Sequence, residues 1–432
     1  MKAKFISIDE AMKKGKGGVA VRGWVYRERG SNKIKFIVLR DSSNIVQCVL
    51  PKEKFEKQWN EIDGVTVESS VEIEGRIRKE ERAPTGYEID VEKFELINRA
   101  EPFPITKDIN EELLLDRRHL WLRSRKMISV LKIRSTVFNA IHEYFRGEGF
   151  YEYQSPIFQS VQAEGGSTLF EVKYFDKKTY LAQTWQLYAE PAIFALEKIY
   201  TIAPSFRAEA SKTARHLTEY WHAEMEAAWV SFDEIQDFGE GLLKHIVKKV
   251  LENNKQELEI LGRDIKKLEP TIKKKFPRIT YDEALKILKE KANMKIPWGK
   301  DLRTIEEDAL SKINETPIII TRYPKEVKAF YMKEDNKNKK VVLGCDFIAP
   351  EGYGEIIGGS ERESDIEKIK KRLKEMGEKV ENYSFYLDTR RYGSVPHGGF
   401  GMGVERVVSW ICGLENIKDA IPFPRTPGRF SP

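Results

Sequence analysis

The sequence predicts an α+β protein of two domains, in which a small five-stranded β-barrel precedes a larger domain of mixed helices and strands. Three observations support this prediction. A chain of 432 residues exceeds the usual size of a single hydrophobic core. Residues 1–100 contain short alternating segments separated by turn residues, and the remainder mixes helical periodicity with short apolar runs. Hydrophobic residues make up 41% and charged residues 33%, which is typical of a globular protein with a heavily charged surface.

Charge and cysteine usage narrow the class of protein. The formal net charge of +6 permits a nucleic-acid partner without requiring one. The three cysteines, Cys48, Cys345 and Cys412, show no paired metal-ligand spacing, which indicates reduced thiols in a cytoplasmic protein. The sequence has no apolar run long enough to span a bilayer and no signal-peptide core at its beginning, so we expect no membrane partner.

Residues 1–100 are predicted to form the barrel, with strands at 19–26, 35–40, 45–50, 70–77 and 87–97. One helix, Glu53 to Asn60, is expected between the third and fourth strands. This order is that of an oligonucleotide/oligosaccharide-binding (OB) barrel. Such barrels stack bases on exposed aromatic rings beside basic side chains. The candidates for this role are Arg27, Arg29, Phe36, Arg40 and Gln47, although a core position for Phe36 fits the pattern equally well.

Residues 101–125 are expected to form a linker or hinge, because Glu101-Pro-Phe-Pro opens the segment with prolines that resist helix and central strand. Residues 126–432 then form the second domain. It is expected to begin with a helix from Ile128 to Gly147, followed by an extended run from Gly149 to Phe158. Further helices are predicted around 190–198, 232–275, 281–292 and 365–377, and strands at 318–321, 341–347 and 354–357.

The stretch from Ala203 to Trp229 organises the second domain. Arg207 and Glu209 lie two apart, and Glu224 and Glu226 repeat this spacing in a second extended run. Residues two apart on a strand share a face, so the stretch predicts two strands that direct an arginine and several carboxylates to one surface. Such a surface suits a polyphosphate bound together with an amine or amide. An amphipathic hairpin with ordinary solvent-exposed charges would explain this segment alone as well.

Two other features point to the same chemistry. The loop between the two runs carries Arg215 and His216, which makes it cationic. A glycine run, Gly399 to Gly403, leads into a helix that contains Arg406, and the start of a helix is a common anion site. The run has neither the P-loop nor the dinucleotide spacing. A neighbouring carboxylate could equally be the partner of Arg406.

Together these stretches resemble the three motifs of the class II aminoacyl-tRNA synthetases. Gly149-Phe with Pro156 resembles the first motif, Phe206-Arg-x-Glu209 with His216-x-x-x-Tyr220 the second, and Gly399-x-Gly-x-Gly-x-x-Arg406 the third. The resemblance implies a catalytic domain with an antiparallel β-sheet flanked by helices, and a homodimer formed through the first motif.

The barrel ahead of such a domain resembles the aspartyl, asparaginyl and lysyl subgroup, and the similarity to the asparaginyl branch extends over essentially the whole chain. It includes Thr213-x-Arg-His-Leu-Thr-Glu219 and Pro350-Glu-Gly-Tyr-Gly-Glu-Ile-Ile-Gly-Gly-Ser360. This resemblance implies ATP-dependent activation of L-asparagine to an adenylate and transfer of the acyl group to the 3′ end of tRNA(Asn). The barrel would then bind the anticodon.

The same resemblance implies a role for individual residues. Those expected to bind ATP are Arg207, Glu209, Arg215, His216, Tyr220, Glu355 and Arg406, and the catalytic set is Arg207, Glu209 and Arg406. Mg²⁺ is expected on Asp346 and Glu355. Glu164 and Gln186 would hold the α-ammonium group of asparagine, whereas Glu224 and Arg362 would hold its side-chain amide. In the barrel, Arg27, Phe36 and Gln47 would contact the anticodon.

The choice between aspartate and asparagine depends on two positions. Aspartyl enzymes resemble this chain at Gln183-Thr-Trp-Gln186-Leu-Tyr-Ala189, but they carry a lysine where Ala189 stands and an aspartate where Glu224 stands. Loss of a cation and the presence of a longer carboxylate favour the neutral amide. Two alternatives remain open, namely an aspartyl-tRNA synthetase with relaxed tRNA choice and an asparagine synthetase acting through aspartyl-adenylate.

Overall fold

The computed structural model describes residues 4–106, 109–161, 163, 169–210 and 215–432. The chain divides into two compact units, one up to Leu120 and one from Trp121. The division falls within the segment where a linker was expected. That segment contains two short helices, α3 (Glu111–Asp116) and α4 (Arg118–Trp121). Each unit is described by itself below.

The first unit is a closed five-stranded barrel with the strand order β1-β2-β3-β5-β4, which confirms the predicted OB barrel. A helix that the sequence prediction omitted, α1 (Ile8–Lys14), precedes it and begins with a capping box formed by Ser7 and Glu10. The strands are β1 (Gly17–Ser31), β2 (Ile34–Arg40), β3 (Ile45–Pro51), β4 (Ser70–Lys79) and β5 (Tyr87–Asn98).

The single helix expected from Glu53 to Asn60 is wrong. The segment forms two 3₁₀ turns, η1 (Lys52–Lys54) and η2 (Glu56–Gln58), followed by a short helix α2 (Trp59–Asp63). The break falls at Phe55, whose backbone leaves the helical region with φ −131°. The Phe55 and Trp59 side chains are both buried in the barrel core, so tertiary packing overrides the local helical preference.

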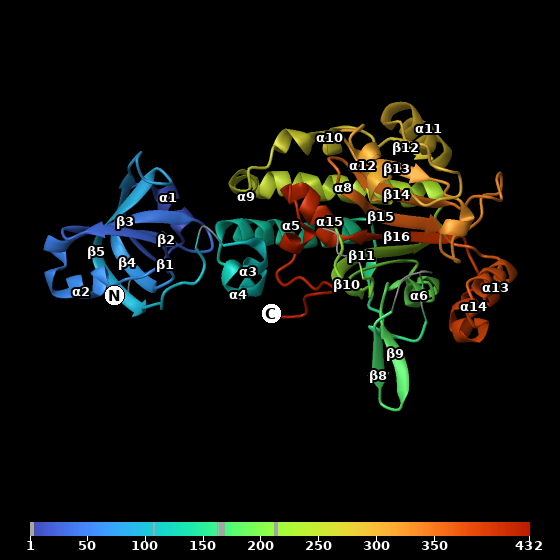
Figure 1. Cartoon of the computed structure of the whole chain (residues 1–432), viewed down its shortest axis with the longest axis horizontal. Helices are drawn as coiled ribbons and strands as arrows, with labels where there is room; N and C mark the ends of the chain where they lie inside the picture. The colour runs from blue at the N-terminus through green and yellow to red at the C-terminus, as the bar shows by residue number, and fades with distance from the viewer. Residues whose placement is uncertain (1–3, 107–108, 162, 164–168, 211–214) are drawn as a thin grey trace. The chain divides into compact units, whose positions relative to one another are not determined.

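The second unit is built around an eight-stranded sheet with the order β12-β13-β14-β15-β16-β11-β10-β6 (Figure 1). Its outermost pairs, β12–β13 and β10–β6, are parallel and the others are antiparallel, which agrees with the expected antiparallel sheet. The strands are β6 (Tyr151–Glu152), β10 (Lys198–Phe206), β11 (Glu219–Ala228), β12 (Arg278–Thr280), β13 (Ile318–Thr321), β14 (Gly344–Ala349), β15 (Gly354–Glu361) and β16 (His397–Gly403).

The two faces of this sheet have different characters. Helices α5 (Arg125–Gly147), α8 (Phe232–Asn253) and α15 (Val404–Cys412) pack with it into one large hydrophobic core. Ala223 and Met225 of β11 belong to this core. Because side chains alternate along a strand, Glu224 and Glu226 point to the opposite face. That opposite face is therefore polar.

Shorter elements surround the main sheet. A three-stranded sheet of order β7-β9-β8 includes the β8–β9 hairpin, which projects from the unit (Figure 1). Its strands are β7 (Phe158–Gln159), β8 (Glu171–Tyr174) and β9 (Lys177–Leu181). The remaining helices are α6 (Gln186–Ala189), α7 (Ile193–Leu196), α9 (Lys255–Ile260), α10 (Glu269–Lys273), α11 (Tyr281–Ala292), α12 (Thr304–Ser311), α13 (Ile366–Glu375) and α14 (Ser384–Arg391). The remaining 3₁₀ turns are η3 (Ile265–Lys267), η4 (Lys325–Val327), η5 (Val380–Tyr383) and η6 (Ile417–Ala420).

Two helix predictions for this unit are wrong in extent. The helix expected around 190–198 is replaced by α6 and α7, and α7 ends because Glu197 adopts a positive φ of 60°. The helical region expected from 232 to 275 is broken after Asn253, where Asn254 leaves the helical conformation. By contrast, the bounds predicted for α11 and β13 coincide with those observed.

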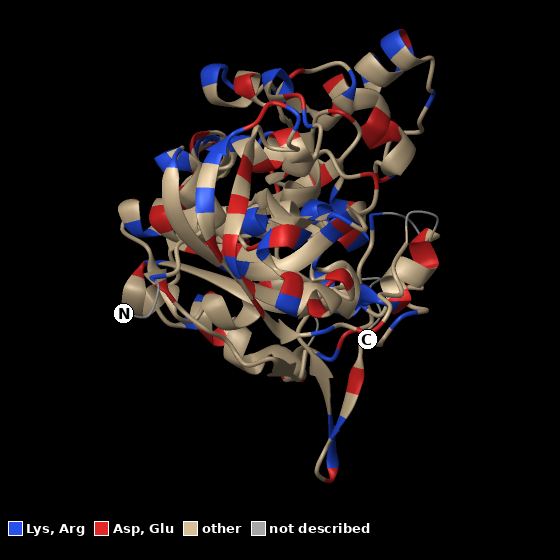
Figure 2. Cartoon of the chain, turned by 90° about the vertical axis from the view of Figure 1, so that its left-hand side faces the viewer, with Lys and Arg blue, Asp and Glu red and all other residues tan. Residues whose placement is uncertain are grey.

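Along the chain, Lys and Arg positions are interspersed among Asp and Glu positions (Figure 2). This distribution agrees with the small formal excess of +6. Among the described residues, we find no helix that is both long and apolar enough to cross a membrane.

The glycine run leads into a helix, as the sequence predicts, and the run itself is a β-strand. Gly399 to Gly403 lie in β16, between β15 and β11, and α15 begins at Val404, so Arg406 lies in the first turn of that helix. A Cβ atom on Gly399 would overlap the carbonyl oxygen of Met225, and one on Gly401 would overlap the ring of His222. Close approach of neighbouring strands and side chains, rather than a special turn, requires glycine here.

We therefore expect Gly399→Ala to lower the free energy of unfolding of the second unit by about 2–3 kcal/mol, because the added methyl group has no space. Urea denaturation followed by tryptophan fluorescence measures this loss. Gly147→Ala is the matched control, since a Cβ there meets no atom within 4 Å and the residue ends a helix. Equal stability of the two variants would contradict the steric explanation.

Candidate functional site

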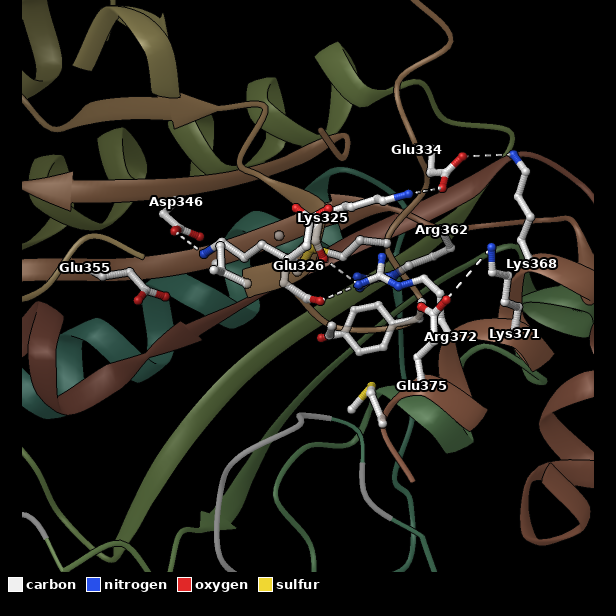
Figure 3. A pocket seen from close by; sticks show the side chains of 18 of the residues that line it. Lys325, Glu326, Glu334, Asp346, Glu355, Arg362, Lys368, Lys371, Arg372 and Glu375 are labelled. Carbon is white, nitrogen blue, oxygen red and sulfur yellow. Dashed lines mark hydrogen bonds and ion pairs between the residues drawn. The ribbon is translucent and has the colours of Figure 1, made fainter. Parts of the chain in front are cut away.

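A cavity of about 1060 Å³ lies in the second unit and is lined by residues from several elements. Asp346 and Glu355 line one part of it, and α13 contributes Lys368 and Lys371 at another (Figure 3). Arg207 also lines this cavity. A smaller cavity of about 100 Å³ shares Arg207 and Glu355 with it. Its lining includes further predicted ATP-binding residues, namely Arg215, His216, Tyr220 and Arg406. The structure thus brings together six of the seven residues predicted to bind ATP, and Glu209 lies in the loop that follows β10.

The small cavity is rich in guanidinium groups. Arg207 follows the end of β10, and its guanidinium lies 5.7 Å from the centroid of the Tyr220 ring. The Arg406 Nη1 atom donates to the backbone oxygen of Glu355 at 2.6 Å. Arg215 pairs with Asp308 of α12 at 2.6 Å. Guanidinium groups from three separate segments that face one cavity suit a ligand with several phosphates.

His216 lies beside these cations. Burial and then the charge of Arg406 lower the pKa of its imidazole, so its ring is neutral at pH 7. The ring can therefore serve as a donor or an acceptor without adding a further positive charge.

The two carboxylates predicted to hold Mg²⁺, those of Asp346 and Glu355, both lie close to Gly358. A Cβ on Gly358 would lie 2.9 Å from Glu355 Oε1 and 3.6 Å from Asp346 Oδ1. Burial and then the charge of Asp346 raise the pKa of Glu355 to about 8. Two hard oxygen donors from adjacent strands, facing the arginine-rich part of the cavity, form a donor set that fits Mg²⁺.

Sequence reasoning missed two charged neighbours of this acidic pair. Glu307 of α12 accepts a hydrogen bond from the backbone N of Glu355 at 3.2 Å. The Nζ atom of Lys328, just after η4, lies 2.6 Å from Asp346 Oδ2. Neither residue belongs to a linear motif, and only the fold brings them to the site.

Arg362, predicted to contact the asparagine amide, is buried and lines the large cavity. Its Nε and Nη2 atoms donate to the two carboxylate oxygens of Glu226 at 2.9 and 2.8 Å, and Nη1 donates to Ser360 Oγ at 2.6 Å. Burial opposes its charge, but Glu226 and then Glu190 raise the pKa of the guanidinium. The site therefore presents a charged donor directly beside a carboxylate acceptor.

Glu224 and Gln186 are both hydrogen-bonded to the segment that leads into α6. Glu224 accepts hydrogen bonds from the Thr184 hydroxyl and, at 2.9 Å, from the backbone N of Trp185. The Gln186 Nε2 atom donates to Glu190 Oε1 at 2.9 Å. Glu164, predicted to hold the α-ammonium group, lies outside the described residues.

A buried ion-pair network adjoins Arg362, and the sequence prediction did not include it. Its centre is Glu190, which pairs with Arg390 at 2.6 Å and with His397 Nε2 at 3.0 Å and accepts from the Tyr386 hydroxyl at 3.0 Å. Burial alone would raise the pKa of Glu190, but Arg390 first, and then His397 and Arg362, hold it well below its usual range.

The geometry of Glu190, Glu226 and His397 would also allow them to share a metal ion. Arg390 and Arg362 already neutralise the two carboxylates, so we interpret the cluster as a structural network. The available sequence signal was a glutamate directly after Ala189, in a largely apolar stretch of the chain.

In the barrel, three of the candidate base-binding residues contact one another, and one of them, Gln47, is buried. The Arg29 guanidinium lies 5.0 Å from the centroid of the Phe36 ring, and its Nη2 atom donates to Gln47 Oε1 at 3.4 Å. The Gln47 Nε2 atom in turn donates to Glu88 at 2.9 Å. Arg27, on the same strand as Arg29, lies 5.3 Å from the centroid of the Tyr26 ring. An aromatic ring with an arginine beside it suits stacking of a base.

Arg40, also a candidate from the sequence, lies elsewhere. It is buried and pairs with the buried carboxylate of Glu68 at 3.0 Å. Its guanidinium lies 5.4 Å from the centroid of the Trp24 ring. These contacts give Arg40 a structural role in the barrel, which corrects the expectation that it belongs with the base-binding side chains.

The Glu190 network predicts a large loss of stability for Arg390→Met, about 3–5 kcal/mol, because a carboxylate remains buried without its nearest cation. Since the pKa of Glu190 is depressed in the folded state, the contribution is present above the ordinary carboxyl value of 4.5 and is lost as the pH falls. The difference between wild type and variant should therefore narrow on acidification. Urea denaturation at pH 7 and pH 4 measures both effects.

Arg391→Met is the matched control. This neighbouring residue is exposed and pairs with the exposed Asp388, so its loss should change stability by less than about 1 kcal/mol. If both variants lost the same stability, the network around Glu190 would not be the source.

The comparisons with known proteins agree with this geometry. Residues 110–427 match the family described as tRNA synthetases class II (D, K and N), and residues 19–97 match an OB-fold nucleic acid binding domain. The chain is 49% identical over 415 residues to the asparagine–tRNA ligase of Thermococcus kodakarensis, with 96% of each chain covered. It is 47% identical over 431 residues to that of Thermoplasma acidophilum, with 99% of this chain and 100% of the other covered.

Among solved structures, the chain is similar to the asparaginyl-tRNA synthetase from Pyrococcus horikoshii complexed with asparaginyl-adenylate. The TM-score is 0.95 and the identity 44%, with 99% of this chain and 100% of the other covered. Sequence, fold and site geometry thus agree, and the chain belongs to the class II tRNA synthetases of the D, K and N family.

Proposed function

We propose that this chain is an asparagine–tRNA ligase, which activates L-asparagine with ATP to asparaginyl-adenylate and then transfers the acyl group to the 3′ end of tRNA(Asn). One observation carries the proposal. A single cavity combines Arg207, the Asp346–Glu355 carboxylate pair and Arg362 with its bound Glu226. These are the groups needed to hold a triphosphate, its metal and a carboxamide close to one another.

ATP lies with its adenine between the Tyr220 ring and the Arg406 guanidinium, an arrangement stabilised by cation–π attraction. Arg207 contacts the α-phosphate, and Arg215 and the neutral His216 lie toward the γ-phosphate. Glu209 completes the ATP-binding set. These groups exchange no protons with the substrate, so positioning and electrostatics supply the rate enhancement.

Asp346 and Glu355 would hold Mg²⁺. When bound, this ion neutralises the charge that develops on the pyrophosphate as the asparagine carboxylate attacks the α-phosphorus. The convergence of both carboxylates over Gly358 supports this assignment, because a side chain at that position would fill the space beside them.

Arg362 donates to the side-chain oxygen of asparagine, and Glu224 accepts from its NH₂ group. Glu226 fixes the Arg362 guanidinium through two hydrogen bonds, so that its charge is already balanced and does not favour a second carboxylate. Gln186 and Glu164 hold the α-ammonium group. Ala189, where aspartyl enzymes carry a lysine, is fully buried beside Trp185 and adds no cation.

The barrel binds the anticodon of tRNA(Asn), with Phe36 stacked on a base and Arg27 and Gln47 beside it. The ligase acts as a homodimer through the segment from Gly149 to Pro156, in the cytoplasm where protein synthesis takes place. Size measurement in solution tests the dimer directly.

The first experiment is amino-acid-dependent ATP–pyrophosphate exchange on the purified protein at saturating ATP and Mg²⁺. We expect exchange with asparagine and less than about 1% of that rate with aspartate, because the proposed acceptor Glu224 would repel the second side-chain oxygen of aspartate. Exchange with aspartate alone would overturn the proposed substrate. Ammonia would then be added to test for free asparagine.

Substitution of Glu224 tests the proposed recognition of the amide. Glu224→Ala should raise the KM for asparagine by more than about tenfold and change the KM for ATP by less than about twofold, because the lost acceptor contacts only the amino acid. Equal changes in both constants would show that Glu224 only supports the loop at Thr184 and Trp185. Glu226→Gln is measured in parallel, because Glu226 holds Arg362 in place. Comparison of the two variants separates loss of the Glu224 acceptor from displacement of the Arg362 guanidinium.

A further inference from the structure

Lys328 is a cation that no motif predicted, and it lies directly on the proposed metal site. Its Nζ atom is 2.6 Å from Asp346 Oδ2 and 3.9 Å from Asp301 Oδ1. The side chains of Lys328 and Asp346 retain only 14% and 11% of their solvent exposure. A pair so shielded from water interacts far more strongly than an ion pair on the surface.

The surroundings fix Lys328 in this place. Its ammonium lies 4.0 Å from the centroid of the buried Tyr323 ring. Its backbone oxygen accepts a hydrogen bond from Arg372 Nη2 at 2.6 Å, and the same nitrogen donates to Lys325 at 2.7 Å. The turn that carries Lys328 is thus tied to α13, and the ammonium of the lysine lies over an aromatic ring beside Asp346.

An ammonium at this position competes with a divalent cation. If a metal ion coordinated Asp346 while Lys328 kept its hydrogen bond, two cations would lie within a few ångströms of each other in a poorly hydrated site. One of them has to leave. The lysine stem is flexible, and Lys328 lines the same cavity as Arg207, so phosphate oxygens bound there offer its ammonium another partner.

We propose that Lys328 is the resident counter-ion of Asp346 and that it makes binding of the metal depend on the nucleotide. The metal then enters the Asp346–Glu355 pair together with the triphosphate, which attracts the ammonium away from Asp346. This inference rests on the proposed function, because it requires Asp346 and Glu355 to be the metal ligands. It adds an order of binding that those ligands alone do not impose.

Binding of Mn²⁺ to the full chain tests the inference without any measurement of turnover. Free Mn²⁺ is counted by electron paramagnetic resonance, with and without ATP and in the absence of asparagine. Without ATP, we expect weak Mn²⁺ binding to wild type and affinity at least about tenfold higher for Lys328→Met, in which the competing charge is gone and an unbranched side chain remains. The added substitution Asp346→Asn should remove this gain.

Lys325→Met is the matched control. Lys325 belongs to the adjoining turn and lines the same cavity, but it pairs with Glu334 at 3.4 Å instead of Asp346. Its loss should leave Mn²⁺ binding at the wild-type level. Equal affinity of the Lys328→Met and wild-type proteins would overturn the role of Lys328.

A second measurement leaves Lys328 unchanged and compares Mn²⁺ binding to wild type and to Asp346→Asn. If wild type without ATP already bound Mn²⁺ tightly and Asp346→Asn abolished this binding, Lys328 would not exclude the metal and the inference would be wrong. With ATP present, Asp346→Asn should weaken Mn²⁺ binding. An unchanged affinity in that measurement would overturn the proposed metal site itself, a result distinct from failure of the Lys328 inference alone.

Discussion

The active-site face depends on one steric constraint. Its charged side chains lie over neighbouring strands of the central sheet, so the residues directly beneath them have to be glycine. Gly358 lies beneath Asp346 and Glu355, and Gly399 lies beneath Glu226. Any Cβ at these glycines would approach a carboxylate oxygen. These two glycines therefore leave space for the acidic side chains to lie close together. Neither glycine has a positive φ, so the backbone is not strained.

Burial of charge is the second requirement, and the chain meets it with partners from distant segments. Glu190 on α6–α7 pairs with Arg390 of α14, and Glu226 of β11 pairs with Arg362 at the end of β15. A buried pair contributes little net stability, but loss of either partner is costly. Its benefit here is fixed geometry. The guanidinium of Arg362 is already oriented, so little reorganisation is needed when a polar ligand arrives.

Much of the fold and part of the site could be predicted from local signals. Helix α11 (Tyr281–Ala292) follows from its periodicity and from the capping box that begins at Thr280. The residues of the small cavity lie in contiguous motifs, which a single sequence displays. What escaped prediction depends on tertiary structure. The positive φ of Glu197 ends α7. The roles of Glu190 and Lys328 follow from their ion-pair partners, Arg390 and Asp346, which only the fold brings beside them.

Strand β11 shows what this architecture permits in evolution. Its odd-numbered residues from Ala223 to Ala227 build the core, and its even-numbered Glu224 and Glu226 point to the opposite face, where Glu226 binds Arg362. A single residue inserted within the strand would exchange the two sets, placing carboxylates in the core and apolar groups in the cavity. Alternate residues of this strand are thus committed to opposite faces of the sheet. Within β11, the core and the polar face can therefore diverge by substitution, each on its own side, without a change of register.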